Sequence, residues 1–189
     1  SGVVPNTSWK KKFIGQNWYI GETLHSGIGQ GYFETTTMQL CLMTAQIANG
    51  GYKIYPQIVA DKELKEQPND KYSQLFKNSK NIKIIQDAMF ASTNEVMGTS
   101  YRSRINNPKY QFAGKTGTAQ VKKITKKDRE LDLKTFQIPY EERDHALYVA
   151  FGPYKNPRYA LSIIVEHGGN GSTTAAPMAK ELFKLIIDR

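Results

Sequence analysis

The sequence is poor in cysteine and in long hydrophobic runs. Cys41 is the only cysteine among 189 residues, so the chain forms no intramolecular disulfide and offers no cysteine cluster for a structural zinc. No run approaches the ~20 apolar residues that a membrane-spanning helix needs. The chain begins Ser-Gly-Val-Val, which is neither a signal peptide nor an initiator methionine. We therefore expect an internal piece of a longer protein.

The composition excludes a disordered or fibrous chain, because 39% hydrophobic and 11% aromatic residues are enough to bury a core. Acidic residues are the minority, with 17 Asp+Glu against 26 Lys+Arg and a net charge of +9. Lysines cluster at 10–12, 122–123 and 126–127, as in proteins that bind phosphate backbones or anionic membranes. No nucleic-acid fold signature accompanies them, and a solvated face explains them equally well, so no nucleic-acid partner is predicted.

Hydrophobic periodicity predicts helices over 33–49, 82–96 and 173–187. Strands are predicted over 110–121, 145–153 and 159–167, the last two joined by a Tyr-Lys-Asn-Pro turn. The first 31 residues are rich in Gly, Pro, Ser and Asn and are predicted to be ordered loop, and charged or polar surface segments are expected at 61–81 and 122–143. Three neighbouring strands among helices predict an α+β fold, an antiparallel sheet with flanking helices.

The stretch with the clearest chemical content is Lys115-Thr116-Gly117-Thr118, on the first predicted strand. Strand alternation places Lys115 and Gly117 on one face and the two threonines on the other. A lysine ammonium beside hydroxyl donors suits a carboxylate, and the missing side chain of Gly117 lets a ligand come close. A surface strand with an exposed lysine is the simple structural alternative.

Lys-Thr-Gly is also part of the signature set of penicillin-binding proteins and class A β-lactamases. Further matching segments occur in order along the chain: WYIGET at 18–23, HSGIGQGY at 25–32, AGKTGTAQV at 113–121, RDH at 143–145, AFGPYKNP at 150–157 and EHGG at 166–169. Together they resemble the C-terminal half of the transpeptidase domain of penicillin-binding protein 2, the elongation-type class B family. Serine β-lactamases share the Lys-Thr/Ser-Gly strand, but the GIGQG and EHGG segments fit the transpeptidase better.

The resemblance implies part of the penicillin-recognising serine enzyme (β-lactamase/transpeptidase-like) fold. The full-length protein would be a serine-type D,D-transpeptidase that cross-links peptidoglycan stem peptides and is trapped by β-lactam antibiotics, without a cofactor. The resemblance places Lys115 near the nucleophile, as an aid to proton transfer. It assigns Thr116 and Thr118 as hydroxyl donors to the substrate carboxylate, Gly117 as the contact for the acyl chain, and the Thr118 N–H as half of an oxyanion hole.

No metal site is predicted, because His25, His145 and His167 are widely spaced and lack a convergent acid. Structural, hydrogen-bonded histidines are the favoured interpretation.

The family's Ser-x-x-Lys and Ser-x-Asn motifs belong upstream of the matched region. Ser8-Trp9-Lys10-Lys11 satisfies the first pattern literally, but it is expected to lie in a basic loop rather than to open a buried helix. Ser92-Thr93-Asn94 satisfies the second pattern, but it falls inside a predicted amphipathic helix. Both are interpreted as coincidences. We therefore predict that 1–189 is the C-terminal portion of a transpeptidase domain, missing its nucleophile and inactive alone.

Such a segment would expose apolar surface, so self-association is expected. The resemblance further implies an inner-membrane protein with this domain on the periplasmic face and the anchor outside the segment. It also implies partners in the elongation complex, including a membrane glycosyltransferase. The alternative, from a different class, is a non-enzymatic β-lactam or muropeptide sensor that uses the same strand without acyl transfer.

Overall fold

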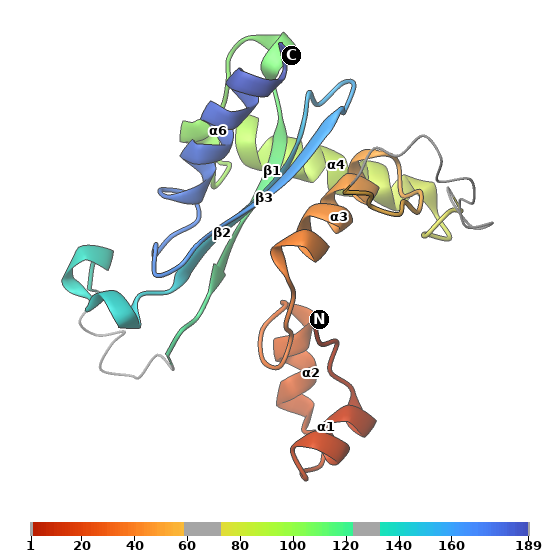
Figure 1. Cartoon of the computed structure of the whole chain (residues 1–189), viewed down its shortest axis with the longest axis vertical. Coiled ribbons are helices and arrows are strands. Elements are labelled where there is room, and N and C mark those ends of the chain that lie inside the picture. The colour runs from red at the N-terminus through yellow and green to blue at the C-terminus, as the bar shows by residue number, and fades with distance from the viewer. Residues whose placement is uncertain (1, 59–72, 123–132, 189) are drawn as a thin grey trace. The chain divides into compact units, whose positions relative to one another are not determined.

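The computed structural model describes residues 2–58, 73–122 and 133–188 (Figure 1). The chain divides into two compact units, Ser1–Leu40 and Cys41–Arg189. Residues 61–72 of the predicted surface segment and residues 123–132 of the charged insertion lie outside the described residues. Within the described residues no helix combines the length and the hydrophobicity needed to cross a membrane.

The N-terminal unit contains two short helices, α1 (Thr7–Phe13) and α2 (Ile20–Gly27). The Asn6 side chain caps α1 by accepting a hydrogen bond from the Trp9 N–H at 2.8 Å, as N-cap asparagines commonly do. The prediction of a loop over residues 1–31 is therefore wrong. Helices of seven and eight residues are too short to show a clear periodicity, and Asn6, part of the composition that suggested loop, serves as the N-cap of α1.

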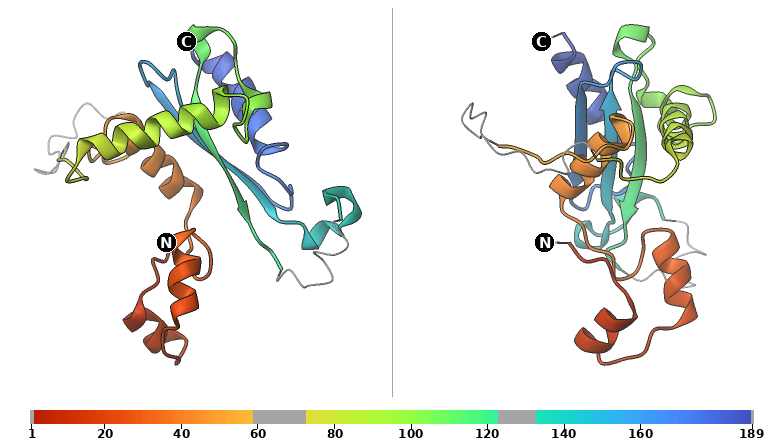
Figure 2. Two further views of the ribbon diagram at one scale, coloured as in Figure 1. Left: turned by 180° about the vertical axis from the view of Figure 1, so that it is seen from behind. Right: turned by 90° about the vertical axis from the view of Figure 1, so that its right-hand side faces the viewer.

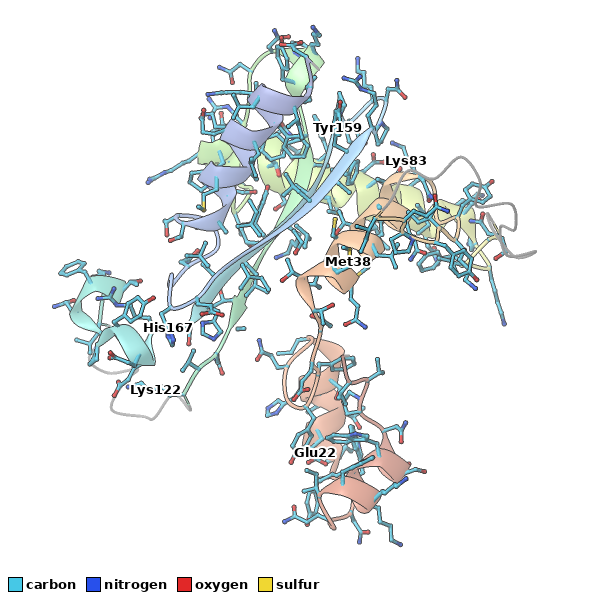
Figure 3. All side chains as sticks on the ribbon, viewed as in Figure 1. Glu22, Met38, Lys83, Lys122, Tyr159 and His167 are labelled. Carbon is cyan, nitrogen blue, oxygen red and sulfur yellow. The ribbon has the colours of Figure 1, made fainter. Side chains whose placement is uncertain are left out.

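A buried lysine holds these two helices together. The side chain of Lys10 is only 1% exposed and forms an ion pair with Glu22, which Figure 3 shows on α2. Its ammonium also lies 4.4 Å from the centroid of the Tyr19 ring, a cation–π contact. The second carboxylate oxygen of Glu22 accepts from the Tyr19 N–H at 2.7 Å. A buried charge is tolerated only when it is paired in this way.

The second unit is built on a three-stranded antiparallel sheet of order β1-β2-β3 (Figures 1 and 2). Its strands are β1 (Ala113–Ala119), β2 (His145–Gly152) and β3 (Tyr159–Val165). The register pairs Thr116 with Tyr148, and Tyr148 in turn with Ile163. The predicted α+β class with an antiparallel sheet is confirmed.

The predicted helices are also present, as α3 (Thr37–Ala48), α4 (Ser79–Asn94) and α6 (Ala175–Ile186). α3 runs across the boundary between the two units in sequence. Short 3₁₀ helices complete the elements: η1 (Tyr101–Ser103), η2 (Pro108–Tyr110), η3 (Thr135–Gln137) and η4 (Tyr140–Glu142).

Helices cover both faces of the sheet (Figure 2). On one face α6 packs small alanines and Phe183 against β2, and the Phe183 ring stacks on Phe112 with centroids 4.7 Å apart. On the other face Met89 and Phe90 of α4 pack against Ala113 and Phe151. Burying one such large side chain stabilises the fold by roughly 1.5–3 kcal/mol. The sheet is thus a rigid platform, and β1 lies at its edge.

Candidate functional site

The Lys-Thr-Gly-Thr segment lies in the middle of β1, an edge strand. β2 pairs with one side of β1, and no strand pairs with its other side among the described residues. Lys115 and Thr118 are exposed, while Thr116 and Gly117 are half-buried. An edge strand presents backbone groups that are open to a further extended chain, so this position suits a peptide-like ligand.

The side chains of Lys115 and Thr116 converge although strand alternation points them to opposite faces. The Lys115 ammonium donates to the Thr116 carbonyl oxygen at 2.8 Å and lies 3.4 Å from the Thr116 hydroxyl. The long lysine side chain thus brings its ammonium back to the neighbouring residue. No carboxylate pairs with Lys115 in the part of the chain that the structure describes. Its positive charge is therefore available to an anion.

A line of hydroxyls from α4 reaches the same threonine. The Ser92 and Thr99 hydroxyl oxygens are 3.2 Å apart, and the Thr99 and Thr116 hydroxyl oxygens are 3.3 Å apart. Sequence reasoning missed Thr99. The sequence offered one signal, the glycine of Gly98-Thr99-Ser100 just after the predicted helix. The structure explains this glycine, because a Cβ on Gly98 would lie 2.6 Å from the Ala91 carbonyl oxygen.

Below this line lies a second, buried set of hydroxyls. The Tyr148 hydroxyl is 2.9 Å from that of Thr93 and 3.1 Å from that of Ser100. The Tyr148 ring passes over Gly114, where a Cβ would lie 2.5 Å from the ring carbon Cζ. Burial raises the pKa of Tyr148, against the opposing effect of its hydrogen bonds to Ser100 and Thr93. This buried hydroxyl cluster of Thr93, Ser100 and Tyr148 ties the end of α4 to the sheet beside β1.

The two literal motif matches fall on α4 and α1. Ser92-Thr93-Asn94 forms the last turn of α4, where Asn94 donates to the Phe112 carbonyl oxygen at 2.9 Å. Ser8 lies on α1, so the expected basic loop is wrong there; its side chain is exposed, as is that of Lys11, the lysine of the literal motif.

The histidines of the second unit occupy the far end of β1 and β2. The His167 N–H donates to His145 Nδ1 at 2.9 Å, and His167 Nδ1 lies 3.1 Å from the Arg143 carbonyl oxygen (Figure 3). His145 pairs with Ala119, the last residue of β1. The described residues contain no group of three His, Cys, Asp or Glu side chains that could hold a metal ion. These two histidines join the loop after β3 to the start of β2.

A glycine in the loop after β3 touches the backbone of β1. A Cβ on Gly171 would lie 2.7 Å from the Gly117 carbonyl oxygen, so only glycine allows this close approach. The Gly171 carbonyl oxygen also accepts from the Ala175 and Ala176 N–H groups at the start of α6. The middle of β1 is thus held from the loop before α6 as well as from α4.

Comparison with known proteins gives consistent matches along the chain. The profile of the penicillin binding protein transpeptidase domain matches residues 3–184. The chain is similar to peptidoglycan D,D-transpeptidase MrdA of Escherichia coli K12, with 31% identity over 199 residues, covering 100% of the chain and 29% of that protein. MrdA of Salmonella typhimurium LT2 is 32% identical over 193 residues, covering 99% and 30%. The chain thus spans less than a third of the length of these relatives.

Solved structures show the same similarity. The penicillin-binding protein PBP2 of Helicobacter pylori, in a complex with MreC, superposes with a TM-score of 0.81 at 31% identity, covering 99% of this chain and 31% of that chain. PBP2 of Pseudomonas aeruginosa, in complex with WCK 5153, gives 0.79 at 34% identity, covering 97% and 38%. The profile match, the relatives and the superpositions agree over nearly the whole chain. The chain belongs to the penicillin-binding protein transpeptidase domain family.

Proposed function

We propose that this chain is the C-terminal portion of the transpeptidase domain of a peptidoglycan D,D-transpeptidase. In this proposal it supplies the wall of the active site that binds stem peptides and β-lactams, and the nucleophilic serine lies on another segment of the full-length protein. The observation that carries the proposal is the Lys115 ammonium, which has no carboxylate partner among the described residues and lies beside the Thr116 hydroxyl on an open strand edge.

The proposed roles follow from the chemistry of each group. Lys115 attracts the substrate anion and helps proton transfer at the nucleophile. Thr116 and Thr118 donate hydroxyl hydrogen bonds to the carboxylate of the donor peptide or the antibiotic. Gly117 lets the acyl chain lie against the strand as an added β-partner, and the Thr118 N–H forms one half of the oxyanion hole.

The proposed setting is the periplasmic face of the inner membrane, with the anchor outside this segment and a role in cell shape. The MrdA relatives support the assignment to peptidoglycan synthesis. The complex of the Helicobacter protein with MreC supports a partnership with an elongation complex. A membrane glycosyltransferase is proposed as a further partner, since newly polymerised glycan strands are the material that a transpeptidase cross-links.

The proposal is tested by intact-protein mass spectrometry after incubation with benzylpenicillin, on the full-length natural protein and on this chain alone. We expect one covalent adduct on the full-length protein and none on the isolated chain. Reversible binding of muropeptides by the full-length protein without any adduct would instead support the sensor alternative. An adduct on the isolated chain would contradict the placement of the nucleophile and would make Ser8 the first serine to replace.

A substitution tests whether Lys115 belongs to the proposed site. In the full-length protein, Lys115→Ala should lower the second-order rate of acylation by about 10- to 100-fold, the value of a hydrogen bond to a charged group. The matched control is Lys155→Ala, which removes an exposed lysine from the turn between β2 and β3. Equal rates for the two variants would remove Lys115 from the proposed site.

A further inference from the structure

The geometry points to Thr99 as a positioning residue for Thr116: its hydroxyl orients the Thr116 hydroxyl toward the carboxylate of the bound peptide or β-lactam. This inference rests on the proposed function and adds a residue from outside the Lys-Thr-Gly strand. Thr99 acts through Thr116 and does not itself touch the ligand.

The first support is the line of hydroxyls that ends on Thr116. Ser92, Thr99 and Thr116 follow one another at 3.2 and 3.3 Å between oxygens. A threonine hydroxyl has one proton and can accept two hydrogen bonds. When Thr116 donates its proton to a carboxylate, its oxygen can accept from Thr99, and Thr99 can accept from Ser92. All three protons then point the same way, and each donated bond polarises the next.

The second support is that the backbone on both sides of Thr99 is fixed. The Gly98 N–H donates to the Glu95 carbonyl oxygen at 2.8 Å, and the Ser100 N–H donates to the Ser92 carbonyl oxygen at 3.0 Å. The Ser100 hydroxyl belongs to the buried hydroxyl cluster, which is anchored on Tyr148 of β2. Thr99 is therefore presented to β1 by a turn that the sheet itself holds in place, as a positioning group requires.

The third support is that Lys115 alone does not fix the orientation of the Thr116 hydroxyl. Lys115 reaches the Thr116 oxygen only at 3.4 Å and gives its shorter bond, 2.8 Å, to the Thr116 carbonyl oxygen. A lysine ammonium turns freely about a flexible chain and holds a neighbour's rotamer poorly. The contact with Thr99 comes from a segment seventeen residues away in sequence and gives the Thr116 hydroxyl a second side-chain partner, one held by a short side chain on a fixed turn.

The test uses the full-length natural protein and two probes, benzylpenicillin and its methyl ester, which lacks the free carboxylate. Thr99→Val removes the hydroxyl and keeps the side-chain shape, and Thr99→Ser is the matched control that keeps the hydroxyl. We expect Thr99→Val to lower the acylation rate with benzylpenicillin about threefold to tenfold, the usual value of one hydrogen bond, and Thr99→Ser to stay within about twofold of wild type. The acid-to-ester rate ratio should also fall, because the neutral ester accepts a weaker hydrogen bond from the oriented hydroxyl than the carboxylate does.

A double-mutant cycle gives the second measurement. On a Thr116→Val background, Thr99→Val should have no further effect on the acylation rate with benzylpenicillin. Equal losses with acid and ester, or additive losses in the cycle, would show a purely structural Thr99 and overturn the inference while leaving the proposed function intact. Absence of any adduct on the wild-type protein would overturn the proposed function and this inference together. Melting temperatures within a few degrees of wild type establish that each variant is folded.

Discussion

Replacing Tyr148 by phenylalanine removes a single oxygen from the centre of the second unit and leaves the ring in place. The side chain is fully buried, so no water can substitute for the lost hydroxyl without entering the core. Two partners lose a hydrogen bond, namely Thr93 at 2.9 Å and Ser100 at 3.1 Å. Tyr148→Phe therefore measures how much the buried hydroxyl cluster contributes to stability.

The size of the effect follows from what the two partners keep. Ser100 retains a bond to the Ser92 carbonyl oxygen at 3.0 Å, and Thr93 retains a longer one to the Met89 carbonyl oxygen at 3.4 Å. Neither hydroxyl is left wholly unpaired, so the loss stays near the value of one to two hydrogen bonds. We expect the free energy of unfolding to fall by about 1–2 kcal/mol at neutral pH.

The same substitution should change the alkaline end of the stability curve. Burial raises the pKa of Tyr148 above its ordinary value of 10.0. Above that pH the unfolded chain loses the phenolic proton while the folded chain keeps it, so the unfolded state binds fewer protons and stability falls as pH rises. Phenylalanine has no such proton. The difference in stability between wild type and Tyr148→Phe should therefore be full below pH 10 and shrink above it.

The assay is urea unfolding followed by circular dichroism at pH 8 and at several values above 10, on wild type, Tyr148→Phe and the control Tyr52→Phe. Tyr52 is exposed, so its variant should be as stable as wild type at pH 8. A Tyr148→Phe protein as stable as wild type at pH 8, or a stability difference that stays constant above pH 10, would refute the reasoning. The first result would mean that the buried hydroxyl cluster contributes nothing to stability. The second would mean that burial does not raise the pKa of Tyr148.

Three further expectations address other parts of the chain. Gly114→Ala should destabilise the fold by about 1–3 kcal/mol, measured by thermal unfolding, because the added methyl overlaps the Tyr148 ring. Any effect of Gly114→Ala on the acylation rate should come from this loss of stability alone. The hydrogen bond from Lys10 lowers the pKa of Glu22 below its ordinary 4.5, so Glu22→Gln should cost stability at pH 7. The difference in stability between wild type and Glu22→Gln should vanish as pH falls through that lowered pKa. Hydrogen exchange of the α2 amides at pH 7 and in acid checks this. α6 exposes Leu182 with two neighbouring apolar side chains, so the isolated chain should self-associate in light scattering, and Leu182→Lys should reduce this.

The parts of the fold that sequence predicted are those with a long and regular pattern. The predicted helix over 82–96 and strand over 145–153 match α4 and β2 within three residues, because many apolar positions repeat at one period. α1 and α2 were missed because they last barely two turns and depend on contacts such as the buried Lys10–Glu22 pair, which lies between residues twelve apart. Such a pair cannot be predicted from the local amino-acid composition.

The candidate site shows the same division between local and distant information. The Lys-Thr-Gly motif selected Lys115 to Thr118 only together with the other matching segments, and the structure brings Lys115 and Thr116 together on an open edge. Their assigned roles stay predictions. Thr99 carries no motif, because its importance comes from α4 crossing the sheet edge and placing a turn beside β1. Such a contact appears only once the packing of a helix against a strand is known.

The two glycines that flank Lys115-Thr116 are explained by different neighbours. Gly114 is required by the chain's own packing, since any Cβ there would lie 2.5 Å from Cζ of the buried Tyr148 ring. At Gly117 the nearest atom that a Cβ would meet is the Cβ of Leu147, at 3.2 Å, a contact that a small shift would relieve. The packing on that face therefore does not by itself demand glycine. In the proposed function an extended acyl chain would lie against the open strand here, and a side chain at this position would obstruct it.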